Sequence, residues 1–295
     1  MTERRLPREV ALLTNPTSGK GKGARARVLA LARLQAAGVA VHDLVGADAD
    51  DARRLARAAL DDGVDALVVC GGDGLVHLAL QLLAGTGVPL GLIPAGTGND
   101  VARYFDLPRT DPVAAADVVV AGRTRVSDLA RSGSSYYATV LCAGFDAVVN
   151  ERANAMTWPR GQMRYNLATL AELRTFAPRT YDLELDGVRH QVEATLVSVG
   201  NGPSFGGGLR ITEGARLDDG LLDVVVVRPL SKLGLVRAYP RLFNGTIAEH
   251  PAYEHHLARE VRVSAPAIVT YADGERFGPL PLTVECAPGA LTILA

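Results

Sequence analysis

Lysine, cysteine and long apolar runs are all scarce in this chain of 295 residues. Three of its 31 basic residues, Lys20, Lys22 and Lys232, are lysines and the rest are arginines, which is typical of a GC-rich genome. The chain has three cysteines, whose spacing fits no zinc motif and which each lie in an apolar stretch. We therefore expect the cysteines to pack in the core of a protein kept in a reducing cytoplasm, not to form a disulfide framework.

An excess of one charge is missing as well. The 31 basic residues face 32 acidic ones, so the formal net charge is −1, whereas a dedicated nucleic-acid binder is usually clearly basic. No apolar run reaches the ~18–20 residues that a membrane span needs. The charged N-terminus MTERRLPREVALL lacks the apolar core of a signal peptide. We expect a cytoplasmic protein with no transmembrane segment and no nucleic-acid partner.

The rest of the composition is that of a globular enzyme, with 48% hydrophobic and 21% charged residues. In the first part of the chain, apolar strand-like runs alternate with segments of helical periodicity, which predicts a parallel sheet covered by helices. We expect strands at 10–14, 39–45, 65–70 and 89–95, and helices at 24–37, 49–61 and 75–84.

From about residue 124 the pattern changes to short strand-like runs separated by Gly, Pro, Asn and Asp turns. Helical patterns interrupt these runs at about 147–176 and 231–244. The fold class we expect is therefore α/β, with an N-terminal α/β domain followed by a mainly antiparallel β-sandwich domain. The boundary is expected between residues 127 and 128.

Three glycine-rich loops follow three of the expected parallel strands. They are Asn15-Pro16-Thr17-Ser18-Gly19-Lys20-Gly21-Lys22-Gly23, Gly71-Gly72-Asp73-Gly74 and Gly96-Thr97-Gly98-Asn99-Asp100-Val101-Ala102-Arg103. In open α/β sheets the carboxyl ends of the strands bind ligands, and backbone N–H groups in such loops can point at phosphate oxygens. The first loop matches neither the Walker A nor the Rossmann pattern, so a flexible turn remains an alternative.

Individual side chains in the second and third loops leave alternatives open. Asp73 could hold Mg²⁺ or polarise bound water, or it could instead cap a helix in a tight turn. Thr97 and Asn99 could cap a helix or bind a phosphate.

Two acidic turns occur in the second part of the chain. Asp218-Asp219-Gly220-Leu221 could form an oxygen-rich cation site, and Glu275 in Tyr271-Ala272-Asp273-Gly274-Glu275 could serve as a general base; ordinary hairpin turns are the alternative for both. Gly202-Pro203-Ser204-Phe205-Gly206 matches the G-x-S-x-G nucleophile elbow. Because Gly207 and Gly208 follow where an elbow leads straight into a helix, we expect a cleft-lining loop instead.

Together, NPTSGKGKG, GGDG, GTGNDVAR, NGPSFGGG, DDGLLDVVVV and ADGE resemble, in order and spacing, the bacterial diacylglycerol kinase and lipid kinase family, to which sphingosine kinases are related. The resemblance extends from about residue 10 to the end of the chain. GGDG is shared with NAD kinases, but the sequence has no segment like TPTGSTAY, which NAD kinases carry.

The resemblance implies an active site between a nucleotide domain, 1–127, and a lipid-substrate sandwich, 128–284, with residues 285–295 returning to the first domain. It implies that Glu275 is the catalytic base. For phosphoryl transfer we expect Asp73 and Asp100 to lie beside the phosphates and hold Mg²⁺ through water. Arg216, Asp219 and Leu221 would form a structural Mg²⁺ site. The expected ATP-binding residues are Asn15, Pro16, Thr17, Ser18, Gly19, Gly71, Gly72, Asp73, Gly74, Gly96, Thr97 and Asn99.

The sequence departs from the usual GGDGT-x-NE of the family at Leu75, His77 and Leu78, and about Gly46 replaces a frequent threonine. These changes affect side-chain contacts to the nucleotide. The implied function is transfer of the γ-phosphate of ATP to a primary hydroxyl of a diacylglycerol-type lipid, giving phosphatidic acid. A kinase of a soluble or sphingoid substrate and a non-catalytic nucleotide sensor are the alternatives.

The expected partner is a lipid at the inner face of the membrane, and a homodimer is left open. Trp158 lies in the segment ANAMTWPRGQMRYNL beside Arg152, Arg160 and Arg164. Such a basic amphipathic segment can lie on an anionic membrane surface, although an ordinary helix packed on the sandwich is the alternative.

Overall fold

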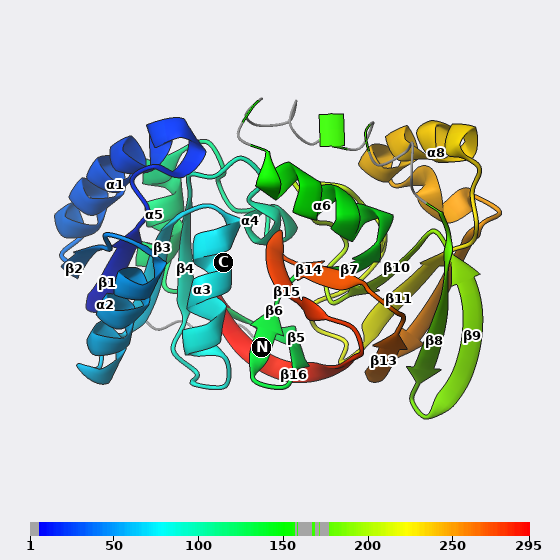
Figure 1. Ribbon diagram of the computed structural model, residues 1–295. Helices are drawn as coiled ribbons and strands as arrows, with labels where there is room; N and C mark the ends of the chain where they lie inside the picture. The colour runs from blue at the N-terminus through cyan, green and yellow to red at the C-terminus, as the bar shows by residue number, and fades with distance from the viewer. Residues whose placement is uncertain (1–5, 157, 159–166, 169–170, 172–176) are drawn as a thin grey trace. The chain divides into compact units, whose positions relative to one another are not determined.

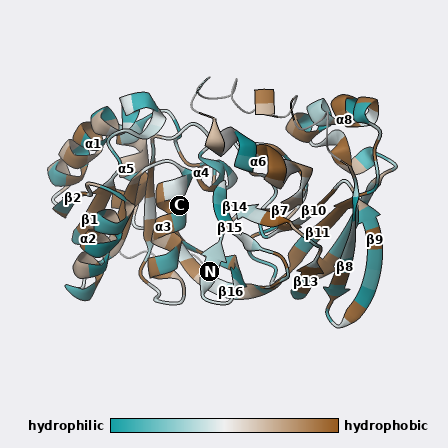
Figure 2. Ribbon diagram, in the orientation of Figure 1, coloured by the Kyte–Doolittle hydropathy of each residue, from teal (hydrophilic) through white to brown (hydrophobic). Residues whose placement is uncertain are grey.

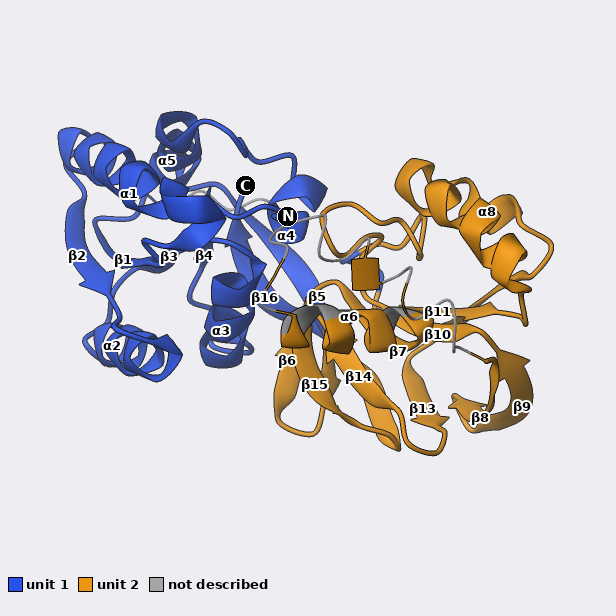
Figure 3. Cartoon of the chain, turned by 45° about the horizontal axis from the view of Figure 1, so that its top comes forward, with its two compact units in different colours: residues 1–129, 217–219, 287–295 blue, residues 130–216, 220–286 orange. Residues whose placement is uncertain are grey.

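The computed structural model describes residues 6–156, 158, 167–168, 171 and 177–295. The chain forms two compact units (Figure 3). Unit 1 comprises residues 1–129, 217–219 and 287–295, and unit 2 comprises residues 130–216 and 220–286. Each unit is described separately below.

Unit 1 contains a parallel sheet in the order β2-β1-β3-β4, as the alternating pattern predicts. Its strands are β1 (Glu9–Thr14), β2 (Ala40–Val45), β3 (Ala66–Gly71) and β4 (Leu90–Pro94). Its helices are α1 (Ser18–Ala36), α2 (Ala49–Asp61), α3 (Asp73–Leu83), α4 (Asp100–Tyr104) and α5 (Pro112–Ala121). Figure 1 shows α1 and α5 on one face of the sheet and α2 and α3 on the other.

Strand β1 is buried on both faces because its side chains alternate between two cores. Val10 and Leu12 pack against Ala30 and Leu34 of α1, while Ala11 and Leu13, equally inaccessible to solvent, point to the opposite face. This explains why the strands of unit 1 have continuous apolar runs and not alternating ones.

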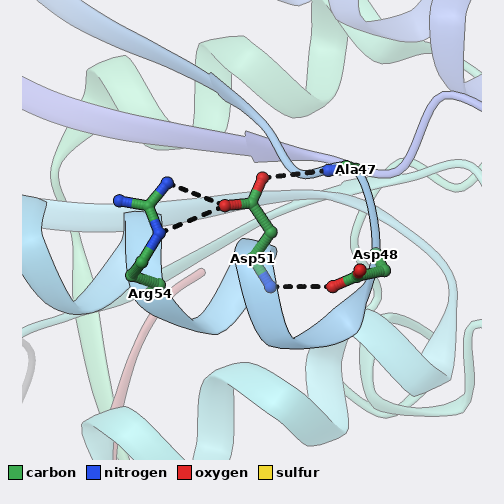
Figure 4. Close-up of polar contacts among 4 residues, drawn as sticks. All are labelled: Ala47, Asp48, Asp51 and Arg54. Atoms are coloured by element: carbon green, nitrogen blue, oxygen red, sulfur yellow. Dashed lines mark hydrogen bonds and ion pairs between the residues drawn. The ribbon is translucent and has the colours of Figure 1, made fainter.

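Helix α2 begins at Asp48 with a reciprocal set of hydrogen bonds (Figure 4). Asp48 Oδ1 accepts the backbone N–H of Asp51 at 2.9 Å, and Asp51 Oδ2 accepts the backbone N–H of Ala47 at 3.1 Å. The Ala47 N–H and then the guanidinium of Arg54 lower the pKa of Asp51. These contacts satisfy N–H groups that have no partner within a helix, which fixes the residue at which α2 starts.

Unit 2 contains two antiparallel sheets around a common core, so the expected sandwich is confirmed. One has the order β12-β11-β10-β7-β14-β15, and the other contains β16, β13, β8 and β9. Alternate residues such as Leu141, Val199, Val224, Tyr181 and Val261 fill the core between them.

The elements of the first sheet are β7 (Val140–Gly144), β10 (Leu196–Gly200), β11 (Leu222–Val227), β12 (Tyr253–Ala258), β14 (Val269–Ala272) and β15 (Glu275–Pro279). Those of the second are β8 (Arg179–Leu185), β9 (Val188–Ala194), β13 (Glu260–Ser264) and β16 (Leu282–Leu294). Strand β5 (Thr124–Ser132) pairs with β16, and β6 (Ser135–Tyr137) pairs with β5. The helices of this part are α6 (Phe145–Ala155), α8 (Lys232–Asn244) and the short η1 (Thr246–Glu249). Among the described residues, no helix is both long and apolar enough to cross a membrane.

Two later segments of the chain belong to unit 1. Strand β16 pairs first with β13, and near its end Ile293 pairs in parallel with Leu90 of β4. Leu217 is held by two hydrogen bonds: its N–H donates to the Tyr104 hydroxyl at 3.1 Å and its carbonyl accepts the N–H of Asp128 at 2.6 Å. The division at 127/128 and 284/285 did not anticipate the return of residues 217–219.

Candidate active site

The three glycine-rich loops meet at the carboxyl ends of β1, β3 and β4 because their backbones are in direct contact. A Cβ atom on Gly96 would lie 2.4 Å from the Cα of Gly72, and one on Gly19 would lie 2.1 Å from the Ala95 carbonyl oxygen. Contacts this short leave no room for a side chain, so these positions require glycine. The result is a surface of backbone groups at the end of the sheet where α/β proteins bind ligands.

The first loop is closed by the side chain of Asn15. Its Oδ1 accepts the N–H of Thr17 at 3.1 Å and the Thr17 hydroxyl at 2.8 Å, which forms an Asx turn. Ser18 follows as the first residue of α1, and the helix is then interrupted where Gly19, Lys20 and Gly21 have φ values of +57°, +63° and +90°. Lys20 is therefore held in a left-handed conformation that costs a non-glycine residue free energy, a feature that clusters at functional sites.

Asp73 connects the second loop to the third. It is the first residue of α3, after Gly72 at the N-cap, so it does not cap its own helix as one alternative proposed. Instead, its two carboxylate oxygens each accept a backbone N–H at 2.8 Å, one from Asn99 and one from Asp100. The carboxylate thus compensates the positive end of α4 and fixes the third loop in place.

The third loop also closes on itself. Asn99 has a φ of +54°; its Oδ1 accepts the N–H of Gly96, and its Nδ2 donates to the Gly96 carbonyl, both at 3.0 Å. Its side chain therefore binds the loop backbone and does not cap α4 as had been one expectation. Thr97, between the two, is exposed at the tip of the loop, where its hydroxyl can reach a ligand.

Asp100 is buried, with 5% of its surface exposed, and Arg103 lies 3.6 Å from its Oδ1. Arg103 also donates from Nη2 to the carbonyl of Gly98 at 3.1 Å. Sequence reasoning gave Arg103 no role, although its place three residues after Asp100, on the same side of a helix, is a signal that could have revealed the pair.

In unit 2, Glu275 begins β15 and is exposed. It pairs with Ala272 across a two-residue turn in which Asp273 and Gly274 have φ values of +53° and +84°. Two consecutive positive values are typical of the tight hairpin turn that Asp-Gly favours. The turn thus places a carboxylate at the solvent end of a strand, where it can accept a proton from a substrate.

Asp273 anchors this turn, which sequence reasoning missed. Its carboxylate accepts the N–H of Ala138 at 3.1 Å, the N–H of Thr139 at 2.9 Å and the Thr139 hydroxyl at 2.6 Å. Asn201 joins the same corner, because its Nδ2 donates to the Ala138 carbonyl at 3.0 Å and its backbone N–H to the Thr139 carbonyl at 2.8 Å. The signal was available in the sequence, since Asp273 lies in ADGE and Asn201 opens NGPSFGGG.

Two family models match the chain: residues 9–132 match the diacylglycerol kinase catalytic domain, and residues 139–295 match the YegS C-terminal NAD kinase beta sandwich-like domain. A diacylglycerol kinase of Mycobacterium tuberculosis is 47% identical over 292 residues, covering 97% of this chain and 94% of that protein. This chain belongs to the diacylglycerol kinase family. The diacylglycerol kinase of Bacillus subtilis is 27% identical, over 92% of this chain and 90% of that protein.

Solved structures show the same fold. A Bacillus anthracis diacylglycerol kinase covers 99% of this chain and 98% of its own with a TM-score of 0.77 at 22% identity. An Archaeoglobus fulgidus NAD kinase in complex with ATP covers 97% of this chain and 92% of its own, with a TM-score of 0.51 at 13% identity. The diacylglycerol kinase fold expected from the motifs is therefore confirmed.

At two of the positions where the chain departs from the family's GGDGT-x-NE pattern, the side chain packs within unit 1. Leu78 is 6% exposed within α3, and the side chain of Leu75 covers Gly71, where an added Cβ would lie 2.9 Å from the Leu75 Cδ2. In this diacylglycerol kinase relative, both positions therefore serve packing and not polar contact with a ligand.

The residues expected to bind metal in the second half of the chain do not belong to one unit. Asp219 belongs to unit 1, whereas Arg216 and Leu221 belong to unit 2. Within the described part of the chain, no group of three or more His, Cys, Asp and Glu residues could hold a metal ion. A site at Asp219 would depend on the two backbone carbonyls and therefore remains a prediction.

The loop that matches a nucleophile elbow is not one. Gly206, Gly207 and Gly208 have φ values of +59°, +87° and +105°, and Phe205 pairs with Leu209 to close the loop where an elbow would continue into a helix. Ser204 is buried, with 7% of its surface exposed.

Trp158 is 77% exposed, while most of the segment around it lies outside the described residues.

Proposed function

We propose that this protein is an ATP-dependent lipid kinase that transfers the γ-phosphate of ATP to the primary hydroxyl of a diacylglycerol-type lipid, giving phosphatidic acid. The observation that carries the proposal is the convergence of three glycine-rich loops in unit 1, of which Asp73 joins the second to the third. Phosphoryl transfer depends mainly on positioning and on neutralising charge, and a rigid surface of backbone N–H groups supplies the positioning.

The residues present fit ATP because three loops rich in backbone N–H groups pack directly against one another at one end of the sheet. The glycines at positions 19, 72 and 96 allow this packing, since a Cβ on any of them would meet the backbone of a neighbouring loop. In the proposal, residues Asn15 to Gly19, Gly71 to Gly74, Gly96, Thr97 and Asn99 line this site. The helix N-termini of α1 and α3 add a favourable potential for anions.

The donor set also fits Mg²⁺ held through water. Both oxygens of Asp73 accept backbone N–H groups and Asp100 is paired with Arg103, so each carboxylate is fixed in position. A cation held there would neutralise charge on the β- and γ-phosphates. Asp219, with the carbonyls of Arg216 and Leu221, is proposed as a second, structural Mg²⁺ site.

Glu275 is proposed as the general base. Its carboxylate accepts the proton of the lipid hydroxyl as that oxygen forms a bond to the γ-phosphorus, and the bond from phosphorus to the bridging oxygen of ADP breaks. The hydrogen bonds of Asp273 support this role, because a base at the end of a rigid hairpin needs no reordering before it accepts a proton. The lipid is expected at the inner face of the membrane, reached from the cytoplasm.

The test is ATP-dependent phosphorylation of a panel that contains diacylglycerol, monoacylglycerol, a sphingoid base and NAD, in mixed micelles, with mass-spectrometric detection. We expect the wild type to convert diacylglycerol to phosphatidic acid. The Glu275→Gln variant should form phosphatidic acid only at a low residual rate. If NAD or the sphingoid base is phosphorylated instead, the proposed substrate is wrong and that compound takes its place. ATP binding without transfer to any member of the panel would favour a nucleotide sensor.

A further inference from the structure

Helix α8 in unit 2 has two apolar faces, and one of them is exposed. Ala238 is 4% exposed, Leu235 packs against Phe145 and Val149 of α6, and Leu242 packs on the outer face of the six-stranded sheet. On the other face, Leu233, Val236 and Phe243 are 58%, 50% and 47% exposed. Core packing therefore explains the first face and leaves the second unexplained.

The exposed side chains form a continuous stripe. At 100° per residue, Leu233, Val236, Pro240 and Phe243 occupy an arc of about 80° on the helix surface. Pro240 is exposed as well, and Tyr239 packs edge-on against Phe243 with ring centroids 5.5 Å apart. We name these four residues the α8 stripe. An exposed apolar patch of this kind on a helix marks an interaction surface.

The charged residues of α8 itself are all basic. Lys232 and Arg237 flank it on opposite sides, Arg241 lies further round the helix, and the sequence KLGLVRAYPRLFN contains no acidic residue. Both ends of the helix are fixed, by the Ser231 hydroxyl accepting the N–H of Gly234 at 3.1 Å and by Gly245 with a φ of +77°. These residues thus lie on a defined helix, α8 (Figure 1), which carries both hydrophobic and hydrophilic residues (Figure 2).

We propose that α8 docks the protein on an anionic lipid bilayer, with the α8 stripe in the boundary between headgroups and acyl chains and the three cations among the headgroups. An apolar stripe flanked by Lys and Arg is the pattern of helices that lie in a membrane surface. Each Lys or Arg near an anionic surface strengthens binding, by about fivefold, and the apolar side chains add their burial. This role rests on the proposed function, since a kinase of a bilayer lipid must reach its substrate.

The experiment measures co-sedimentation of the full chain with phosphatidylcholine vesicles that contain or lack phosphatidylglycerol. We expect Leu233→Gln/Phe243→Gln to lower the partition coefficient by about tenfold or more, since two interfacial apolar side chains are lost. Lys232→Glu/Arg237→Glu should lower it by a similar factor for phosphatidylglycerol vesicles and little for phosphatidylcholine alone. Added salt should lower the partition coefficient of the wild type toward that of Lys232→Glu/Arg237→Glu.

The control is Val188→Gln/Leu257→Gln. It removes two apolar side chains of unit 2 that are 58% and 53% exposed but belong to the β8–β9 hairpin and to β12. We expect wild-type partition from this control and an unchanged melting temperature for all three variants. Wild-type partition of the α8 variants overturns the proposal. The proposal is also overturned if light scattering shows a dimer for the wild type and a monomer for Leu233→Gln/Phe243→Gln. The α8 stripe would then be an interface between two copies of the chain.

Activity separates this proposal from the proposed function. We expect the α8 variants to phosphorylate a short-chain diacylglycerol in solution at the wild-type rate and vesicle-bound diacylglycerol about tenfold more slowly. If no lipid is phosphorylated but vesicle binding still depends on α8, the docking holds and the kinase assignment fails. If lipid is phosphorylated while the α8 variants bind vesicles normally, the assignment holds and the docking fails.

Discussion

Asp73 accepts the backbone N–H of Asp100 at 2.8 Å, so one acidic residue of the candidate site fixes the position of another. The second oxygen of Asp73 accepts the N–H of Asn99 at the same distance. The carboxylate therefore has a structural part, holding the third glycine loop, in addition to the proposed part in holding Mg²⁺. The two can be separated by experiment.

Asp73→Asn is expected to lower both stability and metal-dependent turnover. Asparagine keeps one acceptor oxygen but turns an NH₂ group toward the second backbone N–H, which costs about 1–3 kcal/mol of unfolding free energy. The Mg²⁺ concentration that gives half-maximal turnover should rise. Urea denaturation and a Mg²⁺ titration of initial rates measure the two effects.

Asp111→Asn is the matched control for Asp73. Asp111 Oδ1 accepts the N–H groups of Val113 and Ala114, at 2.9 and 3.1 Å, at the start of α5 in the same unit. Asparagine caps a helix about as well as aspartate, so this variant should change stability little and leave the Mg²⁺ titration unchanged. If Asp73→Asn also leaves the Mg²⁺ titration unchanged, the proposed metal role of Asp73 is wrong.

Gly96→Ala should destabilise unit 1 and weaken nucleotide binding. The new Cβ would lie 2.4 Å from the Gly72 Cα, a backbone atom that cannot move aside alone, so the two loops must separate. We expect a loss of about 1–3 kcal/mol, as for other overpacked sites, and a large rise in the Kd for ATP measured by calorimetry. Gly278→Ala, where a Cβ meets nothing within 4 Å, is the control and should bind ATP normally. Equal ATP affinity in the two variants contradicts the proposed site.

Glu275→Gln should lower kcat by about 10²–10⁴-fold with little change in melting temperature, because general-base catalysis is worth that much and the side chain is exposed. Glu193→Gln replaces an exposed glutamate of β9 in the same unit and should keep the wild-type kcat. Steady-state kinetics with a saturating lipid substrate provide the comparison. A kcat for Glu275→Gln near that of Glu193→Gln would rule out the assignment.

The fold was predictable from the sequence because its signals are local. Helix α2 at Ala49–Asp61 and β1 at Glu9–Thr14 match the expected 49–61 and 10–14, since periodicity and glycine loops mark both. Helix α1 starts six residues earlier than expected, at Ser18, because its first turn runs through the Gly19–Gly21 kink, which hides the helical pattern. Local patterns do not encode which residues far apart in the sequence contact one another in the folded chain.

The candidate site illustrates that limit. GGDG and GTGND could be picked out as loops at strand ends, but the contact of Asp73 with Asn99 joins residues 26 positions apart. Asp273 and Thr139 are 134 positions apart, and their hydrogen bond gives no periodic signal in the sequence. Residue types therefore indicated the chemistry, whereas the residues that position those groups emerged from the tertiary structure.

Stability should fall at alkaline pH because of Cys70. Burial in β3 raises the pKa of the Cys70 thiol from 9.0 to about 12, chiefly through loss of solvation. Between these two values the unfolded chain releases the thiol proton while the folded chain keeps it, so the unfolded state binds fewer protons. The unfolding free energy then falls as pH rises, by up to about 1.4 kcal/mol per pH unit. Below pH 9.0 this contribution is fully present.

Urea denaturation of the wild type and of Cys70→Ala between pH 8 and pH 10.5 measures this slope. The variant is expected to be less stable at pH 8, because it loses a buried side chain that packs against α1. Its stability should decline less steeply with pH, since it has one fewer group that ionises only on unfolding. Iodoacetamide should likewise leave Cys70 unmodified in the native protein at pH 8 and react first with the partly exposed Cys286. Parallel slopes for the two proteins, or rapid native labelling of Cys70, would show that the thiol is accessible and its pKa ordinary.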